Sequence, residues 1–261
     1  MNRRPASADF SQRVAGRFAA AAATYDAHSP AQRHAAARLA GLIAAAGLPP
    51  RPRVLEIGCG TGHLTERLAL HLPGAQILAT DIAPAMVAAC RARLGAAPRF
   101  TYATLDGTRP AVHGPFDLVC ANLAAQWFVD QPATLARLAT LLAPGGLLAV
   151  SLLGAGTFKE WRAAHARQGL TAGTLPFPSA EQCRAAFPAG QLRLDVETWT
   201  ERPASALDFL RSLRAIGADT PTPGHAQLSP ARLRSVLREL GAAPAISYEL
   251  IYARWRAASV V

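Results

Sequence analysis

The chain has 261 residues, which is enough for one large domain or two small ones. Hydrophobic residues make up 51% and charged residues 17% of the sequence, and this balance excludes an intrinsically disordered chain. The 27 basic residues outnumber the 17 acidic ones, so the formal net charge is +10 and an acidic partner is expected. The arginines are scattered without dense runs or interleaved aromatic residues, which disfavours nucleic acid as that partner.

The cysteines and the longest uncharged stretch exclude further classes of protein. Cys59, Cys90, Cys120 and Cys183 lie far apart without a C-x-x-C pair, and the histidines show no metal-ligand spacing. This pattern predicts no metal site and no disulfide framework, and it favours reduced thiols in a cytoplasmic protein. Residues 138–158 carry no charge but contain a Pro-Gly-Gly run, so we expect no membrane-spanning helix there.

The first segment of the chain is predicted to be a helical cap spanning residues 1–48. Apolar residues recur at helical spacing from Val14 and Phe18 to Leu39, Leu42 and Ile43, and this pattern predicts helical structure over residues 12–46. A Gly-Leu-Pro-Pro run then ends the helical segment.

After the cap, short apolar strands and amphipathic helices alternate along the chain. The strands are predicted at residues 53–57, 76–80, 99–104, 116–121 and 147–153, and the helices at 62–71, 84–94, 132–142 and 157–167. The Pro-Gly-Gly run at 144–146 is expected to separate the helix at 132–142 from the strand that follows it. This alternation predicts an α/β fold with a parallel sheet and helices on both faces.

The last third of the chain has a different pattern. Residues 170–190 are rich in proline and glycine and are predicted to form a loop. Residues 192–200 and 245–255 alternate like strands, and two helices at 204–216 and 230–240 lie between them. We therefore expect a strand pair whose helical insertion, at about 203–243, forms a lid above the ligand edge of the sheet.

A glycine-rich loop ends the first predicted strand and opens a helix. Its sequence is E-I-G-C-G-T-G at residues 56–62. Glycines let the backbone approach a ligand closely, and a helix N-terminus offers free N–H groups. The dinucleotide fingerprint G-x-G-x-x-G needs its third glycine one position later, where His63 stands, so the loop is better suited to a smaller nucleoside.

Polar residues follow three further predicted strands. Asp81 ends the second strand, Asp106 follows the third and Asn122 follows the fourth. A carboxylate after the second strand can accept hydrogen bonds from two ribose hydroxyls, and an acceptor after the third can meet an exocyclic amine. Since ligands of open α/β sheets bind at the carboxyl ends of the strands, these residues and the glycine loop predict one nucleoside site.

Over residues 50–155 the chain resembles the class I S-adenosylmethionine-dependent methyltransferases, on the glycine loop and the three polar strand ends. The resemblance implies a Rossmann-like, seven-stranded sheet with an antiparallel last strand, which would lie in a methyltransferase domain at 49–261. It implies S-adenosyl-L-methionine as the cofactor. The cofactor-binding residues it implies are Gly58, Gly60 and Gly62 at the methionine part, Asp81 at the ribose, Asp106 near the adenine, and Arg33, Glu56, Ile82, Met86, Asn122 and Leu123 around them.

A narrower resemblance covers most of the chain and points to the malonyl-[acyl carrier protein] O-methyltransferases of biotin synthesis. It rests on four segments, at residues 18–28 with Gln32, 122–127, 210–218 and 246–253. This family esterifies the free carboxylate of a malonyl thioester, so that fatty-acid synthesis can extend it to a pimeloyl unit. The resemblance implies malonyl-acyl carrier protein as the partner, and the charge of +10 would attract this acidic protein.

The chemistry of such a reaction fits the residue types of the sequence. A carboxylate nucleophile is ionised at neutral pH, so no general base is required. An arginine suits the recognition of the substrate carboxylate, and Arg211 is the first candidate, with Arg214 one helical turn away as the alternative. Tyr25, Gln126 and Trp127 are predicted beside the transferred methyl group, where an indole face would attract a sulfonium cation.

Other functions on the same fold stay open at this point. A small-acid carboxyl methyltransferase of the trans-aconitate type would share the cofactor motifs and the need for arginine, but it would not need a carrier protein. A second alternative is a hydroxylase. The complex I assembly-factor relatives, which hydroxylate an arginine, resemble this group in the segment after the fourth strand. A cofactor-binding scaffold is disfavoured because the glycine loop and Asp81 are intact. An RNA-binding protein is disfavoured because the sequence has no appended RNA-binding module.

Overall fold

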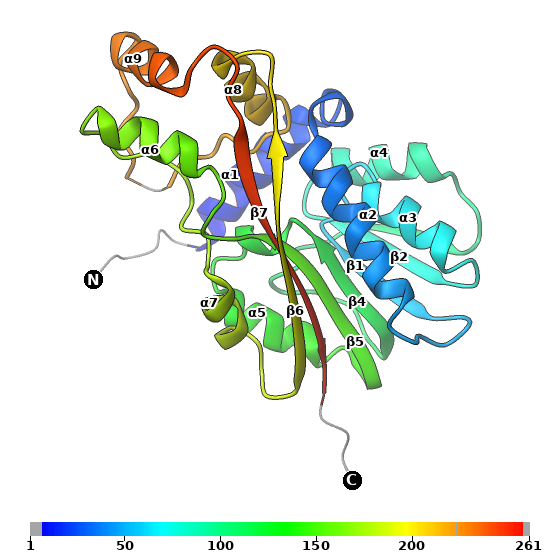
Figure 1. Ribbon diagram of the computed structural model, residues 1–261. Helices are drawn as coiled ribbons and strands as arrows, with labels where there is room; N and C mark the ends of the chain where they lie inside the picture. The colour runs from blue at the N-terminus through cyan, green and yellow to red at the C-terminus, as the bar shows by residue number, and fades with distance from the viewer. Residues whose placement is uncertain (1–6, 223, 258–261) are drawn as a thin grey trace.

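The computed structural model describes residues 7–222 and 224–257. In this part of the chain one seven-stranded sheet has the order β3-β2-β1-β4-β5-β7-β6 (Figure 1). The strands are β1 (Arg53–Ile57), β2 (Gln76–Asp81), β3 (Phe100–Thr104), β4 (Phe116–Asn122), β5 (Leu142–Leu153), β6 (Gln191–Glu201) and β7 (Ile246–Arg256). Strands β1 to β5 run parallel, and β7 is antiparallel to β5 and β6. The predicted fold class is therefore confirmed.

Hydrophobic side chains fill both faces of the central strands. Val54 and Leu118 lie in the core on one face, and their neighbours Leu55 and Val119 lie in the core on the other face. This arrangement follows from the twofold alternation of side chains along a strand. All four side chains are fully buried, as expected for a parallel sheet that is covered by helices on both sides.

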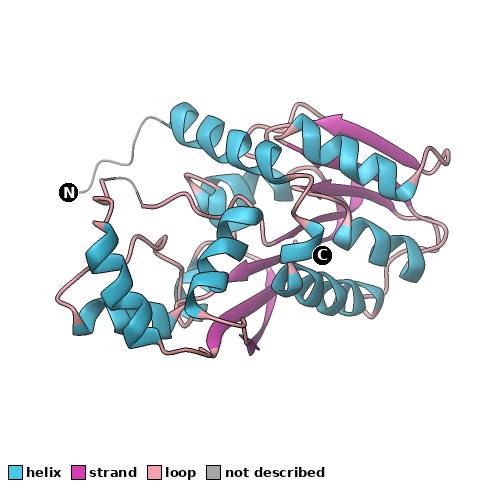
Figure 2. Ribbon diagram, turned by 90° about the horizontal axis from the view of Figure 1, so that it is seen from above, coloured by secondary structure: helices cyan, strands magenta, loops and turns pink. Residues whose placement is uncertain are grey.

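Helices cover the two faces in separate layers (Figure 2). The helices are α1 (Ser7–Ala21), α2 (Pro30–Ala44), α3 (His63–His71), α4 (Pro84–Leu94), α5 (Gln131–Ala139), α6 (Lys159–Arg167), α7 (Ala180–Ala185), α8 (Ala206–Ala215) and α9 (Pro230–Leu240), with the 3-10 turns η1 (Asp26–His28) and η2 (Ala125–Trp127). Buried residues of α2, α3 and α4 join the core of one face, and those of α5 and α7 join the core of the other. The alanine-rich side of α2 lets this helix pack closely on the sheet.

The segment predicted to be helical, residues 12–46, forms two helices, α1 and α2, separated by a turn and η1. Ser29 precedes Pro30, and the proline ring disfavours helical backbone at the residue before it. Ser29 adopts φ −115° and ψ 49°, and a new helix begins at Pro30. The break turns the chain back over the carboxyl edge of the sheet, where Tyr25 and Asp26 lie.

Two further boundaries differ from the prediction. The predicted loop at 170–190 contains the short helix α7, which begins with a capping box between Ser179 and Gln182. This S-x-x-Q signal is present in the sequence. The helix predicted at 132–142 ends at Ala139, and the Pro-Gly-Gly run lies inside β5 instead of before it. The pairing of β4 with β5 shifts register there, and this irregularity accommodates the proline.

The lid helices α8 and α9 are inserted between β6 and β7, and together with α6 they gather beyond the end of the sheet (Figure 1). Residues 1–6 of the predicted cap, residue 223 of the predicted lid and residues 258–261 lie outside the described residues. Within the described ranges, no helix is long and apolar enough to span a membrane.

The carboxyl group of Glu56 is buried below the glycine loop, at the end of β1. The residue is fully buried, and neither carboxylate oxygen has a hydrogen-bond partner among the described residues. A buried carboxylate loses its hydration, so burial raises the pKa of Glu56 to about 8. The folded protein therefore keeps a proton on this group at neutral pH that the unfolded chain releases.

We predict that Glu56→Gln removes a pH-dependent loss of stability. Because the folded pKa exceeds the unfolded one, Glu56 favours folding fully below pH 4.5, and this contribution falls as the pH rises toward 8. The unfolding free energy of the variant should therefore rise relative to wild type by up to about 1.4 kcal/mol per pH unit in that window. Urea denaturation at several pH values measures this difference. The exposed Glu181→Gln serves as the control, and equal pH profiles for wild type and Glu56→Gln would contradict the prediction.

Candidate functional site

The glycine loop forms a cradle at the carboxyl end of β1. Gly58 and Gly60 have φ values of 70° and 54°, which side-chain-bearing residues rarely adopt. A Cβ atom at Gly58 would lie 2.6 Å from Cβ of Ala124, and one at Gly60 would point toward the ring of Tyr25 at 4.0 Å. Glycine is therefore required at both positions, and a bare backbone faces the space below Tyr25.

Asp81 connects the glycine loop to the end of β2. Its Oδ2 accepts a hydrogen bond from Gly60 N at 2.9 Å, and its Oδ1 accepts one from Ala83 N at 2.8 Å. Burial raises the pKa of Asp81, although these backbone hydrogen bonds oppose the shift. A carboxylate offers about four acceptor positions, so both oxygens retain capacity for ligand hydroxyl groups.

A pocket at this edge of the sheet brings together most of the predicted cofactor residues. The predicted residues that line it are Tyr25, Gly58, Gly60, Asp81, Ile82, Met86, Asp106, Asn122, Leu123 and Trp127. Helix α1 closes the pocket with Ser11, Val14 and Phe18, which share one helix face through their spacing of three and four residues. The sequence motifs did not predict this contribution of α1 to the pocket wall.

The polar residues after β3 and β4 are held by local hydrogen bonds. Asp106 Oδ1 accepts from the backbone N and the hydroxyl of Thr108, both at 2.8 Å. Asn122 Oδ1 accepts from Ser151 Oγ at 2.7 Å. Leu123 has a φ of 48°, a strained conformation for a branched side chain, and Ser151 Oγ accepts from its N–H at 3.0 Å. The strand ends are thus rigidly shaped where they line the pocket.

Several predicted site residues lie outside this pocket. Glu56 is buried beneath the loop, and Gly62 packs against α4, where an added Cβ would lie 3.1 Å from Cys90 Sγ. Arg33 donates a hydrogen bond to the backbone carbonyl of Asp26. Gln126 lines a neighbouring cavity, and its Nε2 donates to the carbonyl of Leu123 at 2.8 Å.

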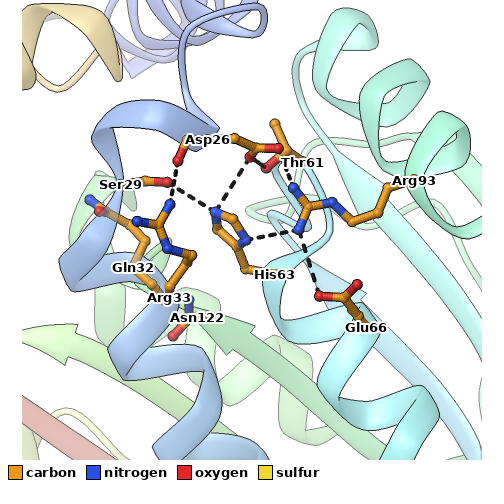
Figure 3. A network of polar contacts seen from close by, with 9 residues as sticks. All are labelled: Asp26, Ser29, Gln32, Arg33, Thr61, His63, Glu66, Arg93 and Asn122. Atoms are coloured by element: carbon orange, nitrogen blue, oxygen red, sulfur yellow. Dashed lines mark hydrogen bonds and ion pairs between the residues drawn. The ribbon is translucent and has the colours of Figure 1, made fainter.

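A network of polar contacts fastens the N-terminal cap to the glycine loop (Figure 3). Asp26 Oδ1 accepts a hydrogen bond from Thr61 Oγ1 at 2.5 Å, and Oδ2 forms an ion pair with Arg93 Nη2 from α4. Arg93 also lies 3.7 Å from Glu66 Oε2. Because Asp26 follows Tyr25 directly, these contacts hold the Tyr25 ring over the pocket.

His63 lies at the centre of the same network. Its Nδ1 accepts from Arg93 Nη1 at 3.1 Å, since an arginine can only donate, and its Nε2 then donates to Ser29 Oγ at 2.9 Å. Burial and the neighbouring Arg93 lower the pKa of His63 to about 4, so the ring is neutral at physiological pH.

Asp26, His63 and Arg93 belong to the site although no sequence motif predicts them there. No short-range pattern in the sequence connects the Tyr-Asp pair at residues 25–26 with the histidine that follows the glycine loop. Asp26 and Arg93 are 67 positions apart, so only the packing of the cap on α4 brings them together.

Aromatic rings form the wall above the pocket. Phe18 packs edge-on against Trp127 with ring centroids 5.6 Å apart, and Tyr25 lies 6.4 Å from Phe18. Burial, with smaller contributions from Asp81 and Asp26, raises the pKa of Tyr25 well above its usual value. The phenol therefore keeps its proton and remains a hydrogen-bond donor.

A second cavity, of about 500 Å³, lies on the other side of this aromatic wall. It shares four lining residues with the first pocket, which are Phe18, Tyr25, Leu123 and Trp127. The lid contributes Leu210, Leu213 and Arg214, and Trp161 and His165 of α6 complete the far side. The predicted lid helix α8 thus roofs a space that adjoins the first pocket across these shared residues.

The structure separates the two candidate arginines of α8. Arg214 and Arg17 both line the cavity and pair with Asp219 Oδ2, at 3.5 and 3.6 Å. The side chain of Arg211 is 67% exposed, pairs with Asp208 at 3.1 Å and lines neither of the two spaces. The structure therefore brings Arg214, and not the first candidate Arg211, to the cavity.

The arrangement combines a nucleoside-type pocket with an adjoining cavity that has aromatic walls and arginines at its rim. In the described parts of the chain no cluster of three histidine, cysteine, aspartate or glutamate residues could hold a metal ion. The four cysteines are buried free thiols. This site is suited to positioning two organic molecules, one of them anionic, against each other in a space shielded from water.

Comparisons with known proteins agree with this geometry. The methyltransferase domain family matches residues 55–148. The YcgJ protein from Bacillus subtilis has a similar fold, with a TM-score of 0.61 and 16% identity, and the match covers 85% of this chain and 99% of that one.

Two curated relatives are closer in sequence. The biotin biosynthesis bifunctional protein BioCD of Bordetella avium is 46% identical over 93% of this chain, which spans about half (52%) of that longer relative. The malonyl-[acyl-carrier protein] O-methyltransferase of Magnetococcus marinus is 38% identical, over 83% of this chain and 81% of the relative. The chain therefore belongs to the malonyl-[acyl-carrier protein] O-methyltransferase family.

Proposed function

We propose that the protein transfers a methyl group from S-adenosyl-L-methionine to the free carboxylate of a malonyl thioester on acyl carrier protein. The observation that carries this proposal is the shared aromatic wall, which joins a nucleoside-type pocket to a cavity with arginines at its rim. The name of the Magnetococcus marinus relative supports the same substrate, and that of the Bordetella avium relative supports a role in biotin synthesis. The product is a neutral methyl ester, which no longer carries the negative charge of the malonyl carboxylate.

The residues of the first pocket fit the cofactor. Asp81 would accept the two ribose hydroxyls, and Asp106, with one oxygen engaged by Thr108, would accept from the adenine amine. The bare backbone at Gly58 and Gly60 would lie against the methionine part, for which the left-handed glycine conformations leave room. Arg33, which lies outside the pocket, would have to exchange its contact with the Asp26 carbonyl to pair with the cofactor carboxylate.

The reaction needs positioning more than acid–base catalysis. When bound, the cofactor supplies an electrophilic methyl group on a sulfonium cation. The malonyl carboxylate is ionised at neutral pH, because carboxylic acids have pKa values of about 4, so no side chain has to remove a proton. Phe18 and Trp127 would exclude water, and Tyr25 would donate a hydrogen bond to the substrate. Good alignment of the reacting atoms can lower the barrier by roughly 7–11 kcal/mol.

Arg214 is the residue that we assign to the substrate carboxylate. It lines the cavity, and its long side chain is 81% exposed and therefore free to reorient toward a ligand. Its planar guanidinium can pair with a carboxylate through two parallel hydrogen bonds. Arg214 shares the single carboxylate of Asp219 with Arg17, so the two arginines keep a net positive charge at the cavity rim.

The carrier protein would dock on the lid. Helix α9 carries three exposed arginines, Arg232, Arg234 and Arg238. The acidic Glu239 on the same helix is already paired with Arg167 of α6, at 2.8 Å. A positive surface of this kind attracts an acidic protein and steers its approach.

We predict that Asp81→Asn weakens S-adenosyl-L-methionine binding by about 10- to 100-fold, the size of lost charge-assisted hydrogen bonds. Isothermal titration calorimetry measures the affinity. Asp117→Asn is the matched control. Asp117 lies at the amino end of β4, whereas the pocket lies at the carboxyl ends of the strands, and its Oδ2 accepts a hydrogen bond from Arg53 N at 2.7 Å. An unchanged affinity in Asp81→Asn would argue against the proposed ribose contact.

Replacing Arg214 should affect the substrate and spare the cofactor. For Arg214→Gln we expect KM for malonyl-acyl carrier protein to rise about tenfold, with cofactor affinity unchanged, because a partly exposed ion pair contributes about 1 kcal/mol or slightly more. Arg211→Gln should stay within about twofold of wild type. Steady-state transfer of a labelled methyl group distinguishes the two variants. The reverse order of effects would restore Arg211 as the substrate ligand.

Salt should slow turnover of the carrier-bound substrate selectively. Because exposed charges are screened at high ionic strength, we expect kcat/KM for malonyl-acyl carrier protein to fall roughly tenfold between 50 and 500 mM NaCl. Malonyl-pantetheine, which lacks the acidic carrier, should show little change. If both substrates respond alike, docking of the carrier through charge is excluded.

A further inference from the structure

A wide groove continues the substrate cavity to the protein surface. The groove has a volume of about 1030 Å³ and lies between the loop at residues 170–177 and the segment that leads into α9. The cavity and the groove share six lining residues, which are Thr174, Leu175, Phe177, His225, Gln227 and Leu228. The groove adjoins the cavity across these six residues, and the cavity adjoins the nucleoside-type pocket across the aromatic wall. We call the groove and the cavity together the path.

The chemistry of the path changes along its length. Near the aromatic wall it is lined by Phe158, Trp161 and other apolar side chains. The groove has an apolar side, from Leu170, Leu175 and Pro176, and two arginines, Arg162 and Arg232.

The two arginines differ in what holds their guanidinium groups. Arg162 donates to the carbonyl oxygens of Ala155 and Thr157, and these bonds fix its guanidinium. Arg232 is exposed in the first turn of α9, where Ser229 caps its backbone N–H. The outer end of the path therefore offers the cation of Arg232 to an anionic group.

His165 offers a neutral acceptor in the middle of the path. Its Nδ1 lies 2.9 Å from the carbonyl oxygen of Trp161, and a carbonyl can only accept, so Nδ1 carries the hydrogen. Burial lowers the pKa of His165, which keeps the ring neutral at physiological pH. Since the ring lines the cavity, Nε2 is the nitrogen that remains to accept a hydrogen bond from a ligand.

We propose that this path holds the phosphopantetheine arm of the thioester substrate, with His165 Nε2 accepting from an amide N–H and Arg232 pairing with the phosphodiester. The inference rests on the proposed function and specifies which part of the substrate is recognised. The arm has the matching sequence of groups, namely an acyl end, a chain with amides and a terminal phosphate. A small free acid would fill the inner end alone and leave His165 and Arg232 without a ligand group.

The test compares two acceptors that differ by one phosphate, malonyl-4′-phosphopantetheine and malonyl-pantetheine. Arg232→Gln should raise KM about three- to fivefold for the phosphorylated acceptor, the size of an exposed charge pair, and leave kcat and the other acceptor unchanged. Arg234→Gln is the matched control, because Arg234 is an exposed arginine on the same helix and does not line the groove. Equal effects of the two variants, or equal effects on both acceptors, would overturn the assignment of Arg232.

The role of His165 is tested with two substitutions. His165→Leu should raise KM for both acceptors about tenfold, whereas His165→Gln, which keeps an acceptor near the position of Nε2, should recover most of the loss. Identical kinetics for the two variants would assign His165 to packing alone and overturn its part of the proposal.

Binding of unacylated 4′-phosphopantetheine, measured by calorimetry, separates this proposal from the proposed reaction. We expect binding that weakens in Arg232→Gln, even if no methyl transfer is found. An absence of binding, with methyl transfer to malonyl-acyl carrier protein intact, would overturn the path and leave the reaction standing. Binding together with a failure of methyl transfer to every malonyl thioester would overturn the reaction and leave the path.

Discussion

The hydrogen bonds of Asp81 are the constraint on which the site depends. The carboxylate ties the glycine loop after β1 to the backbone after β2, so two neighbouring strand ends and the start of α3 are held in one geometry. The loop can adopt its left-handed turns only because Gly58 and Gly60 lack side chains. Every other wall of the pocket, from α1 to the residues after β4, is arranged around this fixed backbone.

The N-terminal cap completes the pocket through electrostatics. Asp26 accepts a hydrogen bond from Thr61 and forms an ion pair with Arg93, and the neutral His63 fills the space between cap and loop. Low solvent exposure keeps His63 unprotonated and Tyr25 protonated. The cap is thereby fastened by polar contacts while the surface it presents to the pocket is aromatic. This combination suits a methyl transfer, which needs a dry, well-aligned space and no proton acceptor.

The lid determines what can reach the pocket. Because β7 returns antiparallel between β5 and β6, the segment that connects β6 to β7 begins and ends near the carboxyl edge of the sheet, and α8 and α9 lie above that edge. The cavity under α8 and the groove beside α9 follow from this connection. The cavity under the lid is therefore separate from the pocket at the glycine loop, and the two spaces meet at Phe18, Tyr25 and Trp127.

The sequence predicted the sheet and its two covered faces, and it also predicted most of the strand-end residues that line one pocket. These features depend on short-range signals, since alternating burial, glycine spacing and polar strand ends are read within a few residues. The narrow resemblance likewise indicated the family before any geometry was known. The break before Pro30 and the capping box at Ser179 were local signals as well, but a continuous apolar pattern and a proline-rich composition obscured them.

Only the tertiary structure decided which arginine faces the cavity and what holds the cap. Arg211 and Arg214 are one turn apart on the same helix and both are exposed, but of the two it is Arg214 that lines the cavity and pairs with Asp219. The contacts of Asp26 with Arg93, and of Arg17 with Asp219, join residues far apart in the chain. Such pairings depend on how helices pack across the sheet, and no spacing in the sequence encodes that packing.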